Sequence, residues 1–370
     1  MKLRLLTTTH EFSKLEKSWE SLTTEPLSSF DWHFEWWKNF GQSRSLNIFV
    51  MESDGQPVGI APFFVDSWIG QKRIRFIGSG KTATDYGRLI VAASNTETFV
   101  DAIGHHLREL GAIGLIEFDG VEPTEPSVEC LWKKLESTHW RYDKFIEPSW
   151  VLPLSDTWDD FIKSSAKSLR RKIRKASKRL ESGELIVRST QNELDVDQAF
   201  KVLVDLHQRR FVSKGERGVF ADPRTVNFLQ SATRSLCLKN QAEILIGFVG
   251  DEPFVAHLYL LGAKGPQLYQ SGADPENMKL EPGHLVFTFA VQKAIEQGCE
   301  EFDFLRGDES YKSFWGAKPR TLIKTRFVSR APVPTMINQS YRALRSAKTA
   351  GVSIWANCSL PGKTPSPQPK

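Results

Sequence analysis

The same order of predicted elements occurs twice along this sequence. A hairpin of apolar strands turns at Gly55-Gln56-Pro57, and the helix after it ends at Gly111 before a buried strand. A second hairpin turns at Asp251-Glu252-Pro253, and the helix after it ends at Gly298 before another strand. Glycine directly after the last turn is a common signal for the end of a helix. The repetition favours two copies of one α/β unit, in which helices pack on a mixed sheet.

The repetition divides the 370 residues into three parts. We predict an N-terminal domain of residues 1–150, a C-terminal domain of residues 151–330 and an extension of residues 331–370. Residues 150–154 are predicted to form a strand that crosses between the halves. Residues 361–370 are rich in proline, serine and lysine, so we expect the extension to be partly disordered.

The composition fits an ordinary globular protein. Hydrophobic residues make up 40% of the chain and charged residues 25%, which excludes a disordered or fibrous protein. The first residues lack the apolar segment of a signal peptide, and no apolar run approaches the ~20 residues that span a bilayer. We therefore expect a cytoplasmic protein. No metal is expected, because the cysteines lack the spacing of a metal site: Cys130, Cys237, Cys299 and Cys358.

Positive charge is concentrated in one predicted helix, residues 162–180. It carries nine lysines or arginines and no acid: Lys163, Lys167, Arg170, Arg171, Lys172, Arg174, Lys175, Lys178 and Arg179. Without these nine charges the net charge of +5 becomes −4. A solvated helix face usually carries both signs, so this face favours an anionic partner, with Arg170, Arg171 and Arg174 as the contacts. The partner is a phosphate-bearing ligand, RNA or an anionic membrane surface.

The densest group of chemically active side chains lies at residues 301–316. A short predicted strand there breaks at Arg306-Gly307-Asp308. Carboxylates, cations and a phenol follow within ten residues: Asp303, Arg306, Asp308, Glu309, Tyr311 and Lys312. The ends of strands are where α/β folds place their chemistry. The alternative is a strand end with solvated charges and two core aromatic residues, Phe314 and Trp315.

Three further features have both a structural and a functional interpretation. The aromatic helix of residues 30–41, which includes Trp36, either anchors a core or stacks on a substrate. His207 at a helix end either packs or contacts a substrate. The helix that opens at Pro282-Gly283 is expected to leave the N–H groups of Gly283, His284 and Leu285 free for an anion. The chain has no P-loop, GxSxG or HExxH motif, which argues against nucleotide hydrolysis, serine hydrolysis and zinc chemistry.

Several of these segments together resemble a known family. They are Ser168-Leu169-Arg170-Arg171, Leu206-His207-Gln208-Arg209, Pro253-Phe254-Val255-Ala256, Pro282-Gly283-His284-Leu285 and the run from Asp303 to Lys312. The pattern resembles GNAT-fold acetyltransferases of the cellulose-biosynthesis-associated type, which are related to Fem-type peptidyltransferases. In the first half, Trp36 and Asp85-Tyr86-Gly87 resemble the family more loosely. The resemblance implies an α/β fold of two tandem GNAT-like domains.

The resemblance also implies a reaction. An acyl group, such as acetyl, would move from acyl-CoA to an amine or hydroxyl of a sugar or envelope-polysaccharide precursor, without a metal. The acceptor must lose a proton as it attacks, so a base is needed. The candidate bases are Asp303, then Glu309 and His257. Tyr311 would protonate the leaving thiolate, and Arg306 and Lys312 would hold phosphate or the oxyanion.

The remaining roles follow from the same resemblance. Gly283, His284 and Leu285 would bind the acyl-CoA, and Trp36, Asp85, Tyr86 and His207 would bind the acceptor. Two other functions stay open. In the first, the donor is an aminoacyl-tRNA, as in Fem-type proteins, and the basic helix grips the RNA. In the second, the protein is not catalytic and the basic helix docks on an anionic membrane or a polysaccharide synthase.

Overall fold

The computed structural model describes residues 1–358 except 81, 83, 110–112 and 138–139. The strands are β1 (Lys2–Leu6), β2 (Ser45–Ser53), β3 (Gln56–Trp68), β4 (Gln71–Phe76), β5 (Ile90–Val91), β6 (Ile113–Val121), β7 (Trp140–Pro153), β8 (Leu185–Ser189), β9 (Ala242–Val249), β10 (Glu252–Gly262), β11 (Gly265–Ala273), β12 (Glu301–Arg306) and β13 (Lys318–Ser329). The α-helices are α1 (Thr9–Ser13), α2 (Glu16–Glu20), α3 (Phe30–Phe40), α4 (Thr96–Glu109), α5 (Pro126–Glu136), α6 (Trp158–Ser164), α7 (Lys167–Glu181), α8 (Val196–Val212), α9 (Pro223–Leu238), α10 (Pro282–Glu296), α11 (Ser310–Phe314) and α12 (Pro332–Cys358).

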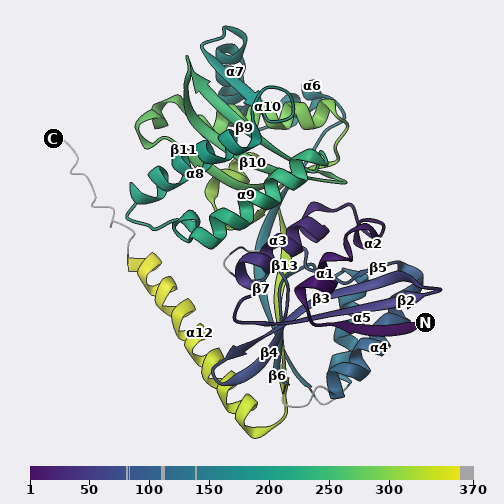
Figure 1. The fold of residues 1–370 in the computed structure, drawn as a ribbon. Helices are drawn as coiled ribbons and strands as arrows, with labels where there is room; N and C mark the ends of the chain where they lie inside the picture. Colours follow the sequence, from purple (N-terminus) through teal and green to yellow (C-terminus); the bar gives the residue numbers. More distant parts are fainter. Residues whose placement is uncertain (81, 83, 110–112, 138–139, 359–370) are drawn as a thin grey trace, which may run out of the picture.

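The strands form one continuous mixed sheet that runs through both halves of the molecule (Figure 1). Its order is β1-β2-β3-β4-β6-β13-β7-β12-β11-β10-β9-β8, with β5 paired to β3. Each half has an antiparallel meander and then a strand that pairs in parallel after a helix, as β4 and β6 do around α4. β11 and β12 do the same around α10. The predicted repetition of one α/β unit is therefore confirmed.

The two halves exchange their last strands. β7, which ends the first half, pairs with β12 of the second half, and β13, which ends the second half, pairs with β6 of the first half. β7 and β13 also pair with each other along all 12 residues of β13, from Lys318 opposite Val151 to Ser329 opposite Trp140. The boundary predicted at residue 150 thus falls inside β7, a strand that belongs to the sheet of both halves.

Hydrophobic side chains form three clusters that follow from this arrangement. The first lies between the halves and joins α3 of one to α8 and α9 of the other, with Trp32 against Phe228 at a ring distance of 4.9 Å. The second lies under α7 and α10, on the outer face of the second half. The third lies under α4 and α5, on the outer face of the first half. The faces that carry α3, α8 and α9 therefore turn toward each other (Figure 1).

The basic helix predicted over residues 162–180 is in fact two helices. α6 ends at Ser164, and Ser165 and Ala166 are extended, with ψ angles of 151° and 148°. The hydroxyls of Ser164 and Ser165 both donate to the carbonyl of Phe161, at 3.1 and 2.7 Å. Serine side chains that take helix carbonyls in this way compete with the backbone and favour a helix end. Of the nine basic residues, Lys163 lies on α6 and the others on α7.

Other boundaries differ from the sequence prediction. α1 and α2 are two short helices separated by Lys14 and Leu15. β1, β8 and α11 were not predicted, since each has only five residues and weak periodicity. The predicted disorder at residues 361–370 lies outside the described residues. No helix within the described part of the chain is long and apolar enough to cross a membrane.

We expect the two halves to unfold together, because β7 and β13 hydrogen-bond to both. Leu322 on β13 is fully buried, so Leu322→Ala should lower the free energy of unfolding by about 2–5 kcal/mol. Calorimetry should show one transition that shifts as a whole. Ile146→Ala on β7, where the side chain is 69% exposed, is the matched control and should change little. If Leu322→Ala instead shows two transitions, one of them at the melting temperature of wild type, the two halves do not unfold together.

Candidate functional site

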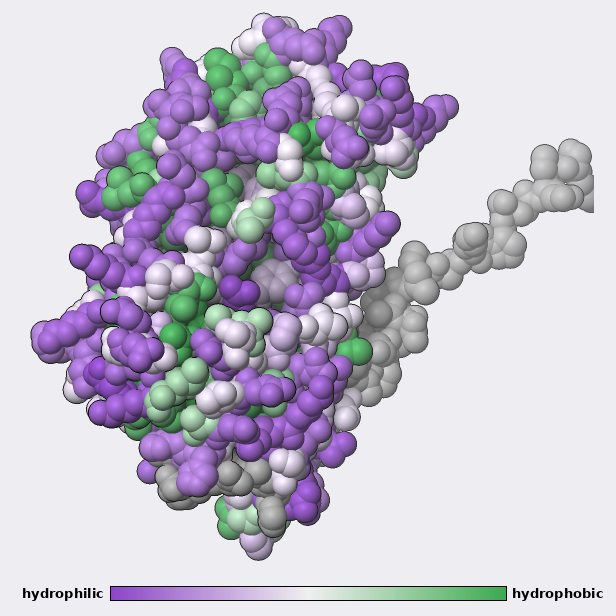
Figure 2. Space-filling model, turned by 90° about the vertical axis from the view of Figure 1, so that its right-hand side faces the viewer, coloured by the Kyte–Doolittle hydropathy of each residue, from purple (hydrophilic) through white to green (hydrophobic). Residues whose placement is uncertain are grey.

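Two pockets adjoin the place where β11 and β12 meet. These parallel strands pair at Gln267 and Asp303. Toward their carboxyl ends lies a pocket of about 440 Å³, lined by both strands, α8 and the start of α11. The other pocket, of about 230 Å³, is lined by Gln267, Asp303, Tyr86 and Arg320 together with residues before α3 and α5. The face of the molecule shown in Figure 2 is hollowed at the waist between the halves, with hydrophilic side chains around the hollow.

Asp303 is the buried acid at this junction. Its side chain is 4% exposed; Oδ1 accepts a hydrogen bond from the N–H of Leu305 at 2.7 Å, and Oδ2 accepts one from the Tyr86 hydroxyl. Burial raises the pKa of Asp303 to about 7, although both hydrogen bonds favour the charged form. The backbone turns sharply here: Leu305 has a φ of 56°, a left-handed value that is uncommon for a leucine. That turn brings the Leu305 N–H onto the carboxylate.

Both halves contribute to the surroundings of Asp303. Arg320, on the exchanged strand β13, lies with Nη1 3.9 Å from the Asp303 carboxylate and 3.4 Å from the Tyr86 hydroxyl. Glu301 holds Arg320 in place through two hydrogen bonds of 3.0 and 2.6 Å. Tyr86 comes from the first half, and its pKa is raised by burial and by the charge of Asp303. The structure thus brings two of the predicted residues, Tyr86 and Asp303, into contact and adds Arg320.

The charged groups of Arg306 and Lys312 are bound by acceptor groups of the protein itself. Arg306 pairs with Asp85 through Nε, and its Nη1 lies 2.7 Å from both Asp119 and Glu147. Lys312 is buried and donates to the carbonyls of Leu305, Arg306 and Gly307, at 3.1, 3.0 and 3.2 Å.

These contacts hold the turn after β12 in shape. A phosphate or oxyanion would have to compete with three carboxylates for Arg306 and with three carbonyls for Lys312. The predicted anion-holding role of these two side chains is therefore corrected to a structural one. Asp85, predicted to contact substrate, is likewise buried against Arg306.

The larger pocket brings together six of the predicted residues, and three of them are Asp85, Arg306 and Lys312, whose charges are bound as described above. Glu309, Tyr311 and His207 all line it, with Arg210 and Lys214 beside them. Glu309 is exposed and lies 2.9 Å from the ammonium of Lys312. The ring of Tyr311 stacks on Phe287 at 5.4 Å, and burial raises the pKa of its hydroxyl. His207 is buried against Phe211 at 4.3 Å, and burial lowers its pKa to about 4, so its ring is neutral at pH 7.

His257, the third candidate base, lies on the opposite face of the sheet from Asp303. Alternation along β10 turns Ala256 and Leu258 into the cluster between the halves and His257 away from it. Its ring contacts Phe287 at 4.7 Å, and Nδ1 lies 2.8 Å from the Tyr259 hydroxyl. Full burial lowers its pKa to about 3. The structure therefore corrects the prediction for His257 to a packing role.

The N-terminus of α10 does not expose the predicted set of N–H groups. Those of His284 and Leu285 donate to the carbonyl of Glu281 at 3.0 and 3.3 Å, which leaves only Gly283 of the three. Glu281 has a φ of 57°, and its carboxylate binds Lys172 and Lys175 of α7. The carboxylate of Glu281 therefore already lies beside the start of α10, where an anion was predicted to bind. The prediction of an anion site there is corrected for this reason.

Two other predicted contacts lie elsewhere. Trp36 is 2% exposed and its Nε1 donates to Thr82 at 2.9 Å, so it belongs to the core between the halves and offers no stacking surface. Arg170, Arg171 and Arg174 line an open depression on α7, away from Asp303. Arg171 and Arg174 are exposed there.

Arg320 and Arg210 were not predicted as site residues from the sequence. Arg320 stands at the start of a strand with no local motif, and only the exchange of strands brings it to Asp303. In the sequence, Arg210 is one of several basic residues near the end of a helix. Only the fold shows that it lines a pocket together with residues of β11 and β12. Among the described residues no cluster of histidine, cysteine and acidic side chains could hold a metal ion.

Residues 167–313 match the family model described as an acetyltransferase (GNAT) domain. No curated protein sequence matches the chain. The crystal structure of FemX is similar, with a TM-score of 0.62 and 13% identity over 91% of this chain and 100% of that chain. The C-terminal domain of a putative lysylphosphatidylglycerol synthetase from Agrobacterium fabrum has a TM-score of 0.55 and 9% identity over 91% of this chain and 98% of that one. A conserved protein of unknown function from Bacteroides thetaiotaomicron has a TM-score of 0.55 and 7% identity over 88% of this chain and 100% of that one.

At such low identity the structural likeness is one of fold alone. Together with the family model it confirms the predicted fold class, a mixed α/β sheet with GNAT-like units. These findings support a GNAT-fold transferase.

The raised pKa of Asp303 predicts a pH-dependent stability. The folded state holds this proton up to a pH of about 7, whereas an ordinary aspartate loses it near 3.8. Its contribution to the free energy of unfolding is therefore full below pH 4 and is lost as the pH rises toward 7. The side chain of the Asp303→Asn variant does not titrate, so its free energy of unfolding does not fall for this reason over the same pH range. Chemical denaturation from pH 4.5 to 8 should show wild type losing stability relative to Asp303→Asn, and a constant difference would contradict the raised pKa.

Proposed function

We propose that this protein transfers an acyl group to an amine, with Asp303 as the general base. The observation that carries the proposal is the position of Asp303, a buried carboxyl that lines the smaller pocket. The next residues, Phe304 and Leu305, line the larger pocket. The acceptor occupies the smaller pocket and the acyl donor occupies the larger one.

The environment of Asp303 suits proton transfer. A base works best when its pKa lies near the working pH, and burial raises the pKa of Asp303 to about 7. Tyr86 donates a hydrogen bond that fixes the carboxylate, and Arg320 limits how far its pKa rises. Asp303 takes the proton of the attacking nitrogen, while Tyr311 in the larger pocket is placed to protonate the leaving group.

The charges around the smaller pocket favour an amine over a hydroxyl as the acceptor. Its lining includes Glu25, Glu122, Glu125, Glu301 and Asp303. The cations there are Arg88, Lys264 and Arg320, and Arg320 is neutralised by Glu301. This surplus of carboxylates attracts a protonated amine. An amino sugar of an envelope-polysaccharide precursor would fit this chemistry.

The donor is acyl-CoA in the leading form of the proposal, as the acetyltransferase model over residues 167–313 suggests. The larger pocket between the separated strands would take the thioester arm. Because Glu281 occupies the start of α10, the diphosphate would instead meet Arg210 and Lys214 beside the pocket. CoA supplies the activated thioester, and the residues of this chain hold it, exclude water and move the proton.

Aminoacyl-tRNA is the second candidate donor. It is favoured by the exposed arginines of α7, Arg171 and Arg174, which have no carboxylate partner in the described part of the chain. The likeness of fold to FemX is compatible with this donor.

Asp303→Asn should lower kcat by roughly 10²–10⁴-fold, since an amide cannot accept the proton. In wild type, kcat/KM should rise with pH through about 7 as Asp303 loses its proton. Tyr86→Phe removes a hydrogen bond to the charged form and should move that rise to higher pH. Glu309→Gln is the matched control and should change the rate less than about threefold. Full activity in Asp303→Asn would remove Asp303 as the base.

Binding assays separate the two donors. If acyl-CoA is the donor, acetyl-CoA should raise the melting temperature, and Arg210→Gln should weaken its binding about tenfold, while Arg171→Gln with Arg174→Gln leaves it unchanged. If tRNA is the donor, binding should fall steeply with salt and should depend on Arg171 and Arg174. Binding of neither acetyl-CoA nor tRNA would reject acyl transfer by both routes.

A further inference from the structure

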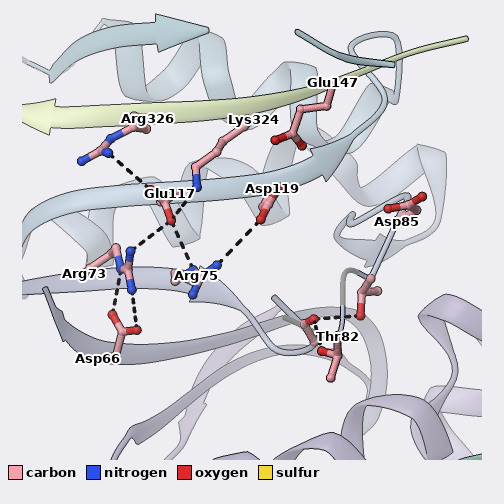
Figure 3. A network of polar contacts seen from close by, with 12 residues as sticks. Asp66, Arg73, Arg75, Thr82, Asp85, Glu117, Asp119, Glu147, Lys324 and Arg326 are labelled. Carbon is pink, nitrogen blue, oxygen red and sulfur yellow. Dashed lines mark hydrogen bonds and ion pairs between the residues drawn. The ribbon is translucent and has the colours of Figure 1, made fainter. Parts of the chain in front are cut away.

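A second set of charged side chains lies outside the proposed active site, on the inner face of the first half. We call it the Glu117 cluster: Asp66, Arg73, Arg75, Glu117, Lys324 and Arg326. Figure 3 shows its four cations pointing toward Glu117 from β4 and β13. Their nitrogens lie 3.1 Å (Arg73), 3.5 Å (Arg75), 3.3 Å (Lys324) and 3.6 Å (Arg326) from its carboxylate.

The cluster holds more cations than it can neutralise. Arg73 is satisfied by Asp66, through two hydrogen bonds of 2.9 and 2.8 Å. Arg75, Lys324 and Arg326 are then left to share Glu117, because Asp119 is 3.9 Å from Arg75 and is bound more closely by Arg306 at 2.7 Å. Burying like charges without partners is unfavourable. An anion in contact with Arg75, Lys324 and Arg326 would stabilise their charges.

Guanidinium nitrogens that lack a hydrogen bond of normal geometry gather at the same place, although the Nε of Arg75 is the atom that forms the 3.5 Å ion pair with Glu117. Arg75 is 8% exposed as a residue, and its Nε makes no hydrogen bond. Arg44, at the end of α3, also has a buried Nε without a hydrogen bond. Arg44 and Arg75 lie against the same ring, Phe64, at 5.5 and 6.0 Å from its centre. The two guanidinium charges repel each other and Asp66 attracts both, so an anion bound here would add to the negative charge that Asp66 supplies.

Arg326 adds charge behind this position. Its side chain is 1% exposed, and its guanidinium lies between the rings of Trp68 and Tyr341, at 4.5 and 3.8 Å. The three nitrogens make no hydrogen bond of normal geometry. By contrast, the side chains of Arg73, Arg75 and Lys324 are 13%, 9% and 16% exposed, so a ligand can reach them.

We propose that the Glu117 cluster and Arg44 form a binding site for the phosphate group of a ligand. Five cations lie around Asp66 and Glu117, with Asp119 3.9 Å from one of them, Arg75, and a phosphate can supply up to two negative charges and several acceptor oxygens. Guanidinium groups bind phosphate through paired N–H donors. A single carboxylate would leave more of the surplus charge unmatched. The site uses neither Asp303 nor the two pockets, so it stands independently of the proposed acyl transfer.

The test is a titration of the full chain with sodium pyrophosphate, inorganic phosphate and acetate at constant ionic strength. Binding is followed by calorimetry and by the melting temperature, which rises with any ligand that binds the folded state. We expect pyrophosphate and phosphate to bind and acetate to bind at least about tenfold more weakly. Arg75→Met should weaken pyrophosphate binding about tenfold, because it removes a charged hydrogen bond.

Glu117→Gln provides the opposite test. It removes the negative charge that competes with the ligand, so it should tighten pyrophosphate binding while lowering the melting temperature of the free protein. Lys324→Met, at the accessible edge of the cluster, is the second weakening variant should Arg75→Met fail to fold. Arg234→Met on α9, whose side chain is 65% exposed, is the matched control and should bind as wild type does. Equal binding by wild type, Arg75→Met and Lys324→Met, or no pyrophosphate binding by wild type, overturns the proposal.

Discussion

The pairing of β7 with β13 is the constraint on which the rest of the molecule depends. Because each strand also pairs with the opposite half, the sheet continues from one GNAT-like unit into the other without an edge between them. The faces that carry α3, α8 and α9 are thereby turned inward and share one hydrophobic cluster. The same pairing carries Arg320 to Asp303 and Lys324 to Glu117. One exchange of strands thus sets the fold, the candidate active site and the anion site.

Several charged side chains are buried where the two halves meet. The ratio of cations to carboxylates differs from one of these places to the next. Arg306 is surrounded by three carboxylates, so it stabilises the turn after β12. Asp303 has a cation only at 3.9 Å, which leaves desolvation dominant and its pKa high. Arg75 has Glu117 at 3.5 Å and Asp119 at 3.9 Å, and it shares both carboxylates with other cations. Arg306 is bound directly by carboxylates, whereas Asp303 and Arg75 lack a close partner of opposite charge, and buried groups of that kind are candidates for chemistry or for ligand binding.

Much of the fold followed from the sequence, because hairpin turns and a helix-ending glycine such as Gly298 are local signals, whereas the glycine predicted to end the earlier helix, Gly111, lies outside the described residues. Asp303 and Tyr86 were identified as candidates, but their hydrogen bond joins residues 217 positions apart and no local pattern contains it. The predictions for Lys312 and Arg306 were wrong because a cation in sequence does not reveal its partners. The helix predicted over residues 162–180 was wrong because two serine hydroxyls can take a carbonyl from the backbone.

The exchange of strands has a consequence for how such a chain can arise. A gene that encodes one unit yields a product whose final strand fits a gap in a neighbour, and whose own gap needs the neighbour's final strand. Two identical products satisfy this requirement by reciprocal insertion around a twofold axis. Joining them into one polypeptide makes the insertion intramolecular and frees the copies to diverge. One copy then carries Asp303, while the other carries the Glu117 cluster.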